Sequence, residues 1–200
     1  MGRLKRRENR EQNSVMILFF LIGFLLGTIL PNVLWKTKTG QEAAASLYFL
    51  TTFMDTGISG KEYLLEILKV RGSYLVLCVL CGFSIFGVPL SVVSSCISGL
   101  QTGAVLSVSV LQFGLTGGLV GLGFLMPQYL VYVPVWLMIM EEIYRKSREI
   151  WVKDGMLSVR FREYCLRTAV LSLAYFLGIL LECYVNPMLV EKMTEVLKLF

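Results

Sequence analysis

Apolar residues gather along this chain in blocks that are longer than the core of a soluble protein needs. From Gly72 to Met140 the sequence contains no Asp, Glu, Lys, Arg or His. A membrane-spanning helix needs about 20 apolar residues, so this block is long enough for several crossings. Ser14–Trp35 and Thr168–Val185 form two further apolar blocks. The pattern predicts an all-α protein, a polytopic integral membrane helical bundle.

The charged residues divide the long block into spans. Lysine and arginine concentrate on the cytoplasmic side of membrane proteins, and they dominate both residues 1–13 and the loop 141–167. One crossing by the first span places Arg71 outside, so the chain must cross an odd number of times to return Glu141 to the cytoplasm. Three crossings fit the length, and we place them at Ser73–Val92, Gly99–Leu125 and Pro127–Ile143. This predicts about five transmembrane helices in the cell membrane, with the amino terminus cytoplasmic and the carboxyl terminus extracytoplasmic.

The first span is predicted to be an uncleaved anchor rather than a signal peptide. Its apolar run is too long for a signal peptide, and Lys36, Lys38 and Glu42 separate it from the cleavage-like Ala43–Ala45. The predicted organisation is a basic cytoplasmic arm at 1–13, an anchor at 14–35, an extracytoplasmic helical segment at 36–71, a transmembrane bundle at 72–187 with a basic cytoplasmic loop at 141–167, and a short extracytoplasmic tail at 188–200.

Shorter elements are expected beside these spans. Ala43–Met54 is apolar but too short to cross a bilayer, which favours a helix that lies at the membrane interface. Ser59 and Glu62 have the spacing of a capping box, so a helix should begin at about Gly60 and lead into the membrane. The excess length of the third span leaves room for a re-entrant piece near residues 91–103.

The composition narrows the possible chemistry. Charged residues make up 16% of the chain, whereas a soluble protein carries about a quarter. The net charge of +5 lies beside the apolar blocks, where it would meet lipid headgroups, and this argues against a nucleic-acid partner. The chain has no histidine, the usual general base and a common metal ligand. We therefore expect no catalytic site, no metal and no cofactor.

Two prolines mark the predicted fourth span. Pro127 begins it, at a position where a missing N–H costs little. Pro134 lies inside and frees the carbonyl near Leu130, which must find a partner when water is absent. We therefore expect the kink at Pro134 to face protein rather than lipid. Pro89 predicts a similar bend in the second span.

Glycines recur at a spacing of four residues, which aligns them on one face of a helix and lets two backbones approach closely. The pattern predicts either helix contacts within one bundle, which we favour, or a seam between copies in a homo-oligomer. The glycines concerned are Gly23, Gly27, Gly99, Gly103, Gly114, Gly117, Gly118 and Gly121.

Glu182 is the one acidic residue within a predicted span, and such residues usually face a polar interior and serve a function. Gln128, Tyr129 and Tyr132 lie at the matching end of the fourth span. If the fourth and fifth spans pack side by side, one of these side chains can donate a hydrogen bond to Glu182. The alternative is that Glu182 reaches toward outer headgroups.

Basic residues in the second cytoplasmic loop are predicted to bind anionic lipid at the inner surface, and a cytosolic partner is the alternative. These residues are Arg145, Lys146, Arg160, Arg162 and Arg167.

Two ordered motifs resemble the stage II sporulation protein M family. PQYLVYVP spans Pro127–Pro134, and LLECYVNP spans Leu180–Pro187 and closes the last predicted span. The wider family commonly has P-H-G-x-x-E-x-P at the first motif, so Gln128 replaces its histidine and Tyr132 replaces its glutamate. The candidate functional residues that this resemblance singles out are Pro127, Gln128, Tyr132, Pro134, Glu182, Asn186 and Pro187.

The resemblance implies a non-enzymatic membrane scaffold. Such a protein would localise septal peptidoglycan hydrolases, the stage II sporulation proteins D and P, during forespore engulfment, and its docking surface would be residues 36–71. The alternative is a small permease or the membrane subunit of a transporter that uses Glu182 and the proline-kinked helices. An intramembrane enzyme is a third possibility, disfavoured by the absence of histidine.

Overall fold

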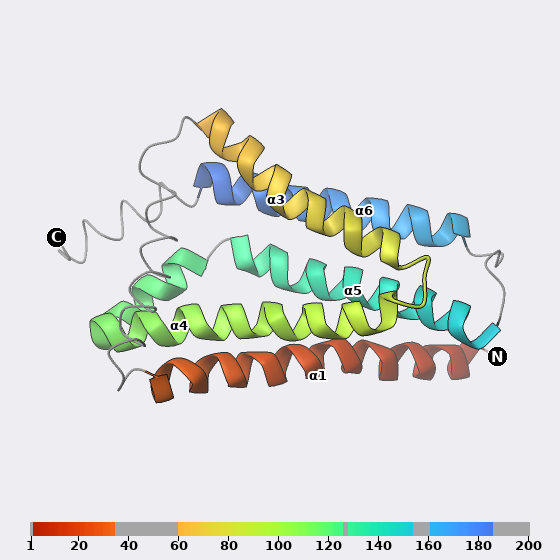
Figure 1. Ribbon diagram of the computed structural model, residues 1–200, viewed down its shortest axis with the longest axis horizontal. Coiled ribbons are helices and arrows are strands. Elements are labelled where there is room, and N and C mark those ends of the chain that lie inside the picture. Colours follow the sequence, from red (N-terminus) through yellow and green to blue (C-terminus); the bar gives the residue numbers. More distant parts are fainter. Residues whose placement is uncertain (1, 35–59, 126–127, 154–160, 186–200) are drawn as a thin grey trace.

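A computed structural model describes residues 2–34, 60–125, 128–153 and 161–185, and these form an all-α bundle (Figure 1). No strand occurs in these ranges, which confirms the predicted all-α helical bundle. The helices are α1 (Gly2–Leu34), α3 (Gly60–Cys81), α4 (Gly87–Leu125), α5 (Gln128–Lys153) and α6 (Phe161–Leu180), and α6 continues into a π-helical turn, η1 (Leu181–Val185).

The helices run side by side in alternating directions. Figure 1 shows α1 and α4 in a lower layer, α5 in the middle, and α3 and α6 above it. The end of α1, the start of α3 and the end of η1 all lie at the left-hand end of this view. The turn between α3 and α4 lies at the other end, where α5 ends and α6 begins.

Helix α5 supplies the centre of the core. Its buried side chains recur with helical spacing and include Tyr132, Trp136, Ile139 and Ile143, so they occupy one face of the helix. Tyr175 and other side chains of α6 pack against this face. The packing of α3, α4 and α6 around α5 brings together side chains that lie far apart in the sequence.

Glycines join α1 to α4 backbone against backbone. A Cβ added at Gly23 would lie 2.0 Å from the carbonyl oxygen of Cys96, and one added at Gly27 would lie 2.2 Å from that of Leu100. The contact is reciprocal, because a Cβ at Gly99 would lie 2.1 Å from the Phe20 oxygen. Only hydrogen fits at these positions, and the helices approach closely enough for Cα–H···O contacts.

The other predicted packing glycines have different outcomes. A Cβ at Gly103 would lie 2.4 Å from the Phe24 oxygen, so this residue belongs to the same contact. Gly114, Gly117, Gly118 and Gly121 lie in the last part of α4, where the structure describes the backbone helix only. The four glycines of the α1–α4 contact therefore pack within one chain.

Three helices in the described ranges are long and apolar enough to cross a membrane: Val15–Leu34, Gly87–Leu111 and Arg162–Val185. Many of their large apolar side chains are exposed, among them Leu25 on α1 and Leu173 on α6. The structure thus supports transmembrane character for these three helices, and the number of five spans stays a prediction.

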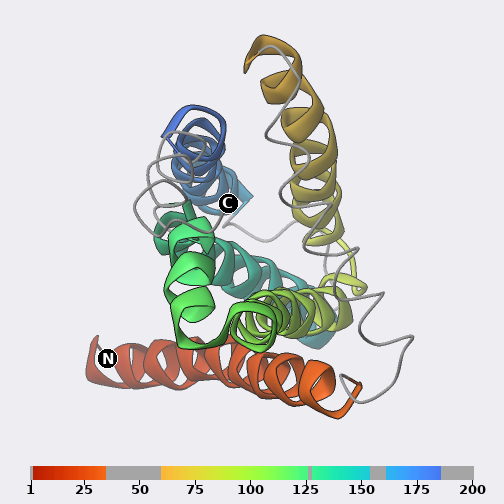
Figure 2. The same cartoon turned by 90° about the vertical axis from the view of Figure 1, so that its left-hand side faces the viewer.

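The predicted boundaries between the second and third spans are wrong. Instead of one span over Ser73–Val92, α3 ends at Cys81 and α4 begins at Gly87. Pro89 occupies the first turn of α4, where proline is tolerated, so it accompanies a new helix rather than a bend within one. Helix α4 then runs without interruption through residues 91–103, where the sequence leaves room for a re-entrant piece. The last part of α4 bends away from the axis of its earlier part (Figure 2).

Helix α3 begins at Gly60, as expected, and continues past Arg71 to Cys81 without a break. This agrees with the predicted helix that leads from about Gly60 into the apolar block. The boundary at residue 71 between the extracytoplasmic segment and the bundle stays a prediction. The expected helix at 43–54 and the capping residue Ser59 lie outside the described residues.

Pro134 does not face the protein interior. It is exposed, and so is Leu130 one turn earlier. The buried face of α5 contains Tyr132 and Trp136, and Pro134 lies two residues from each, which is about 200° around the helix. The proline therefore projects away from the core, contrary to the expectation from the sequence.

Side-chain hydrogen bonds fasten the turn between α3 and α4. The buried Ser147 of α5 donates to the Ser84 carbonyl and accepts from the Val88 N–H at 3.1 Å. Tyr164 of α6 donates to the Val79 carbonyl at 2.8 Å. These bonds add side-chain partners to backbone groups of the turn and join it to α5 and α6.

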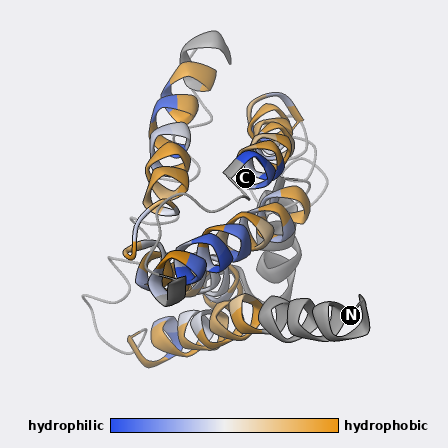
Figure 3. Ribbon diagram, turned by 90° about the vertical axis from the view of Figure 1, so that its right-hand side faces the viewer, coloured by the Kyte–Doolittle hydropathy of each residue, from blue (hydrophilic) through white to orange (hydrophobic). Residues whose placement is uncertain are grey.

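Charged residues gather at this same end of the molecule. Figure 3 shows hydrophilic ribbon along the last turns of α5 and at the start of α6. Glu142 forms ion pairs there with Arg145 and, at 3.1 Å, with Arg167, which also lies 3.4 Å from Glu163.

Candidate functional site

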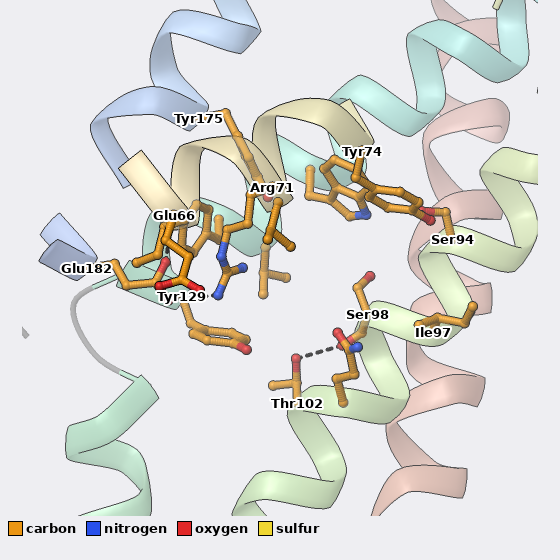
Figure 4. Close-up of a pocket in the computed structure, with 16 residues that line it drawn as sticks. Glu66, Arg71, Tyr74, Ser94, Ile97, Ser98, Thr102, Tyr129, Tyr175 and Glu182 are labelled. Carbon is orange, nitrogen blue, oxygen red and sulfur yellow. Dashed lines mark hydrogen bonds and ion pairs between the residues drawn. The ribbon is translucent and has the colours of Figure 1, made fainter. Parts of the chain in front are cut away.

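Glu182 lies at the centre of a buried polar cluster. The Arg71 Nη2 atom is 2.7 Å from Glu182 Oε1, and the Tyr132 hydroxyl donates to Glu182 Oε2, also at 2.7 Å. The Arg71 guanidinium lies 4.8 Å from the centroid of the Tyr132 ring, as in a cation–π contact. One carboxylate thus binds α3, α5 and η1 together (Figure 4).

The sequence predicts the hydrogen bond from Tyr132 on the condition that the fourth and fifth predicted spans pack together, and they do. It does not predict the ion pair, because charge patterning places Arg71 at the end of the extracytoplasmic segment. The structure brings Arg71 to Glu182 across 111 positions of sequence.

The local backbone of α6 and η1 allows Glu182 and Tyr132 to meet. The π-helical turn contains one residue more per turn than an α-helix, and both Glu182 and Cys183 are buried within it. Gly178, one turn earlier, leaves room for the Tyr132 ring, because a Cβ there would lie 2.8 Å from Tyr132 Cε1. The sequence pattern did not single out Gly178.

Aromatic rings continue the cluster along the inside of the bundle. The centroid of Tyr175 lies 4.8 Å from Tyr132 and 5.5 Å from Trp136. Trp136 in turn lies 5.6 Å from Tyr74 of α3, and the two rings are stacked. This row joins α3, α5 and α6 through side chains, and it forms one wall of a cavity.

The cavity has a volume of about 630 Å³ and lies between α3, α4, α5 and α6 (Figure 4). Arg71, Glu66 and Glu182 supply charge to its lining. The wall from α4 is polar, and its residues Ser94, Ser98, Gln101 and Thr102 share one helical face. The Tyr74 hydroxyl donates to Ser94 Oγ at 3.0 Å and links α3 to this wall.

The polar wall carries a sequence signal that periodicity could have revealed. Ser94, Ser98 and Thr102 are four residues apart within an otherwise apolar block. Polar positions at this spacing predict a helix face that avoids lipid. Tyr175 gave no comparable signal, because an aromatic residue in an apolar helix is ordinary core material.

The cluster holds a paired charge. Both oxygens of Glu182 are bonded, and its side chain is only 10% exposed. Arginine stays protonated in proteins, so the pair persists as an internal salt bridge. Within the described ranges no three His, Cys, Asp or Glu side chains are grouped as metal ligands.

The predicted lipid-binding residues do not form one surface. Lys146 is buried, at 5% exposure, because it falls on the core face of α5 beside Ser147. This contradicts its predicted contact with lipid. Arg145 and Arg167 both bind Glu142, and Arg162 is exposed. Arg160 lies outside the described residues.

Several residues of the two motifs have no described side chain. Pro127, Asn186 and Pro187 lie outside the described residues, and Gln128 is described only as the first residue of α5.

Comparison of the chain with known protein families, curated proteins and solved structures gave no match.

Proposed function

We propose that this bundle is inserted in the cell membrane with five crossings and acts as a non-enzymatic scaffold. Its amino terminus is cytoplasmic and its carboxyl terminus is extracytoplasmic. It resembles stage II sporulation protein M in its two ordered motifs, and its partners are the septal peptidoglycan hydrolases, stage II sporulation proteins D and P. In this role it holds those enzymes at the membrane during forespore engulfment.

The observation that carries the proposal is the common position of three helix ends. The end of α1 at Leu34 and the end of η1 at Val185 lie just before the two proposed extracytoplasmic segments, 36–71 and 188–200, and α3 begins at Gly60 within the first of them. These three helix ends lie at one end of the bundle (Figure 1). The alternating directions of the helices agree with repeated crossings. The segment 36–71 and the tail 188–200 would then emerge on the same side and offer a partner one docking surface.

The Arg71–Glu182 pair supports this role by stiffening that end. Glu182 lies six residues before the proposed tail at 188–200, and Arg71 is the last residue of the proposed extracytoplasmic segment at 36–71. Their contact, together with Tyr132, ties both segments to α5. A scaffold needs such a fixed geometry more than it needs a reactive group.

A crosslinking experiment tests the scaffold. A photo-crosslinking amino acid at Tyr48 in sporulating cells should capture protein D or protein P, because that position lies in the proposed docking segment. The same group at Lys153, on the proposed cytoplasmic side, is the matched control and should capture neither. Capture of a cytosolic nucleotide-binding subunit at Lys153 and of no hydrolase at Tyr48 would refute the scaffold role.

The membrane topology has its own test. A cysteine introduced at Lys153 should react with a membrane-impermeant maleimide only after the cells are opened, whereas one introduced near Lys36 should react in intact cells. Labelling of position 153 from outside intact cells would refute the proposed orientation whatever partner is found.

Transport is the second candidate, and the cavity beside Arg71 and Glu182 is the observation that favours it. Its volume of about 630 Å³ falls within the range of small-molecule sites. In this case Glu182→Gln should abolish a substrate-dependent flux into vesicles that contain the purified protein. A scaffold predicts no flux to abolish, and it predicts that hydrolase capture survives Glu182→Gln if the bundle stays folded.

A further inference from the structure

Both polar and apolar side chains line the cavity between α3 and α4. Arg71 points into the space between Tyr129 and Ser98 in Figure 4. Val70 of α3 and Ile97 of α4 also line the cavity, and they are 66% and 46% exposed. A ligand that matches both kinds of side chain has a polar head and an apolar tail.

The exposed lining residues Val70 and Ile97 place the open side of the cavity between α3 and α4, and a ligand can enter there. Helices α3 and α4 meet at the turn 82–86 and diverge toward the start of α3, which both Figure 1 and Figure 2 show. The cavity lies between these two helices, with α5 and α6 behind it. In a membrane, this opening faces the lipid rather than water.

The charges of the lining indicate the kind of head. The lining contains one cation, Arg71, and two carboxylates, Glu66 and Glu182. A purely anionic head would compete with Glu182 for Arg71 and would be repelled by Glu66. A head with both a phosphate and an ammonium group satisfies all three charges, since guanidinium groups bind phosphate well and ammonium groups are attracted by carboxylates and aromatic faces.

We propose that this cavity binds the headgroup of a zwitterionic phospholipid of the phosphatidylethanolamine type. The phosphate faces Arg71 and the polar wall at Ser98 and Gln101. The ammonium group lies toward Glu66 and Glu182, and the acyl chains leave between Val70 and Ile97. The inference rests on membrane insertion, and it is independent of the scaffold role.

Lipid retention tests the site. The full-length protein is reconstituted into nanodiscs with equal amounts of phosphatidylethanolamine and phosphatidylglycerol, extracted with mild detergent, and examined by native mass spectrometry. We expect one retained phosphatidylethanolamine per chain, enriched about tenfold over phosphatidylglycerol, which corresponds to one charge-assisted contact. Equal retention of the two lipids, or preference for phosphatidylglycerol, would overturn the charge argument.

Substitutions in the polar wall separate binding from folding. Ser98→Leu and Gln101→Leu fill the cavity without touching the ion pair, and each should lower retention of phosphatidylethanolamine about tenfold. Val93→Leu, on the exposed face of α4, is the matched control and should leave retention unchanged. Unchanged retention in both wall variants would overturn the site.

A soluble headgroup distinguishes a lipid from a free zwitterion. Glycerophosphoethanolamine has the same head without acyl chains, and we expect it not to displace the retained lipid. Displacement by this compound at concentrations similar to those of the lipid would overturn the assignment to a lipid. These results bear on the cavity alone, because hydrolase capture at Tyr48 and labelling at position 153 are read out separately.

Discussion

The α1–α4 contact and the Arg71 cluster join helices in two different ways. In the first, glycines such as Gly23 and Gly99 bring backbone against backbone, and a hydrogen bond of 2.9 Å from Asn32 to Ser107 closes one end. In the second, long side chains span the distance between α3, α5 and η1, with Arg71 and Glu182 at the centre. The cavity lies beside the second contact.

This difference shows what each contact can tolerate. Two backbones in contact have no side chain that can move aside, so an added methyl group must separate the helices. Arginine and tyrosine side chains can adjust by rotation, but the charge they enclose must remain paired. Steric changes should therefore be most harmful at the α1–α4 contact, and changes of charge most harmful at the Arg71 cluster.

Arg71→Gln should have the largest effect. The substitution leaves the buried carboxylate of Glu182 with Tyr132 as its remaining partner. We expect the unfolding free energy to fall by about 3 kcal/mol. This value is at the low end for a broken buried ion pair, because the Arg71 side chain is 33% exposed. Unfolding by SDS in mixed micelles measures it. The exposed Lys69→Gln on the same helix is the control, with a change below about 0.5 kcal/mol.

The double variant Arg71→Met with Glu182→Leu sharpens this result. Removing both charges leaves neither one unpaired, so its loss should be smaller than that of Arg71→Gln alone. A double variant that is less stable than Arg71→Gln would contradict the view that unpaired charge is the source of the loss.

Gly99→Ala should have the next largest effect, a loss of about 2 kcal/mol from overpacking against the Phe20 backbone. Gly72→Ala is the matched control, because its added Cβ would meet only Leu68 Cδ1 at 3.7 Å. Alanine favours helices more than glycine does, so Gly72→Ala should gain about 0.5 kcal/mol. Equal effects of the two substitutions in SDS unfolding would argue against a tight α1–α4 contact.

Tyr132→Phe tests the neutral partner of Glu182. It removes one hydrogen bond to a charged group and keeps the ring, so we expect a loss of about 1.5 kcal/mol. Tyr184→Phe on η1 is the control, since Tyr184 is 52% exposed. Thermal unfolding in detergent, followed by circular dichroism, should show a lower midpoint for the first variant only.

Gly178→Ala should have the smallest effect and compares the two contacts most directly. Like Gly99 it has no room for a Cβ, but its neighbour is the Tyr132 ring rather than backbone. A small ring movement can relieve the clash, so the loss should be about 1 kcal/mol or less. A loss as large as that of Gly99→Ala would show that Tyr132 cannot move and that the cluster is as rigid as the glycine contact.

Most helices were recognisable from the sequence, whereas several boundaries were not. The start of α3 at Gly60 and the apolar block within α1 follow from local patterns. The break between α3 and α4 lies in an uncharged stretch where no charge marks it, and Pro89 marks a helix start there rather than a bend. Ser147 and Tyr164 pair its backbone groups from helices that follow much later in the chain.

The candidate site divides in the same way. Glu182 was conspicuous because an acidic residue among apolar ones is rare, and Tyr132 was recognised as a possible donor. Arg71 was missed because charge patterning assigns residues beside an apolar block to a membrane surface. That rule describes averages along the chain, and it carries no information about a partner 111 positions away.

The sequence by itself determined that the chain folds as helices with largely apolar surfaces, since helix periodicity and the charge-free block are local properties of neighbouring residues. It also determined that glycine spacing suits a close helix contact. Only the tertiary structure decided that Gly23 and Gly27 meet α4, that Arg71 neutralises Glu182, and that a cavity remains beside them. These depend on the angles and rotations with which helices pack, and those are set by many weak side-chain contacts acting together.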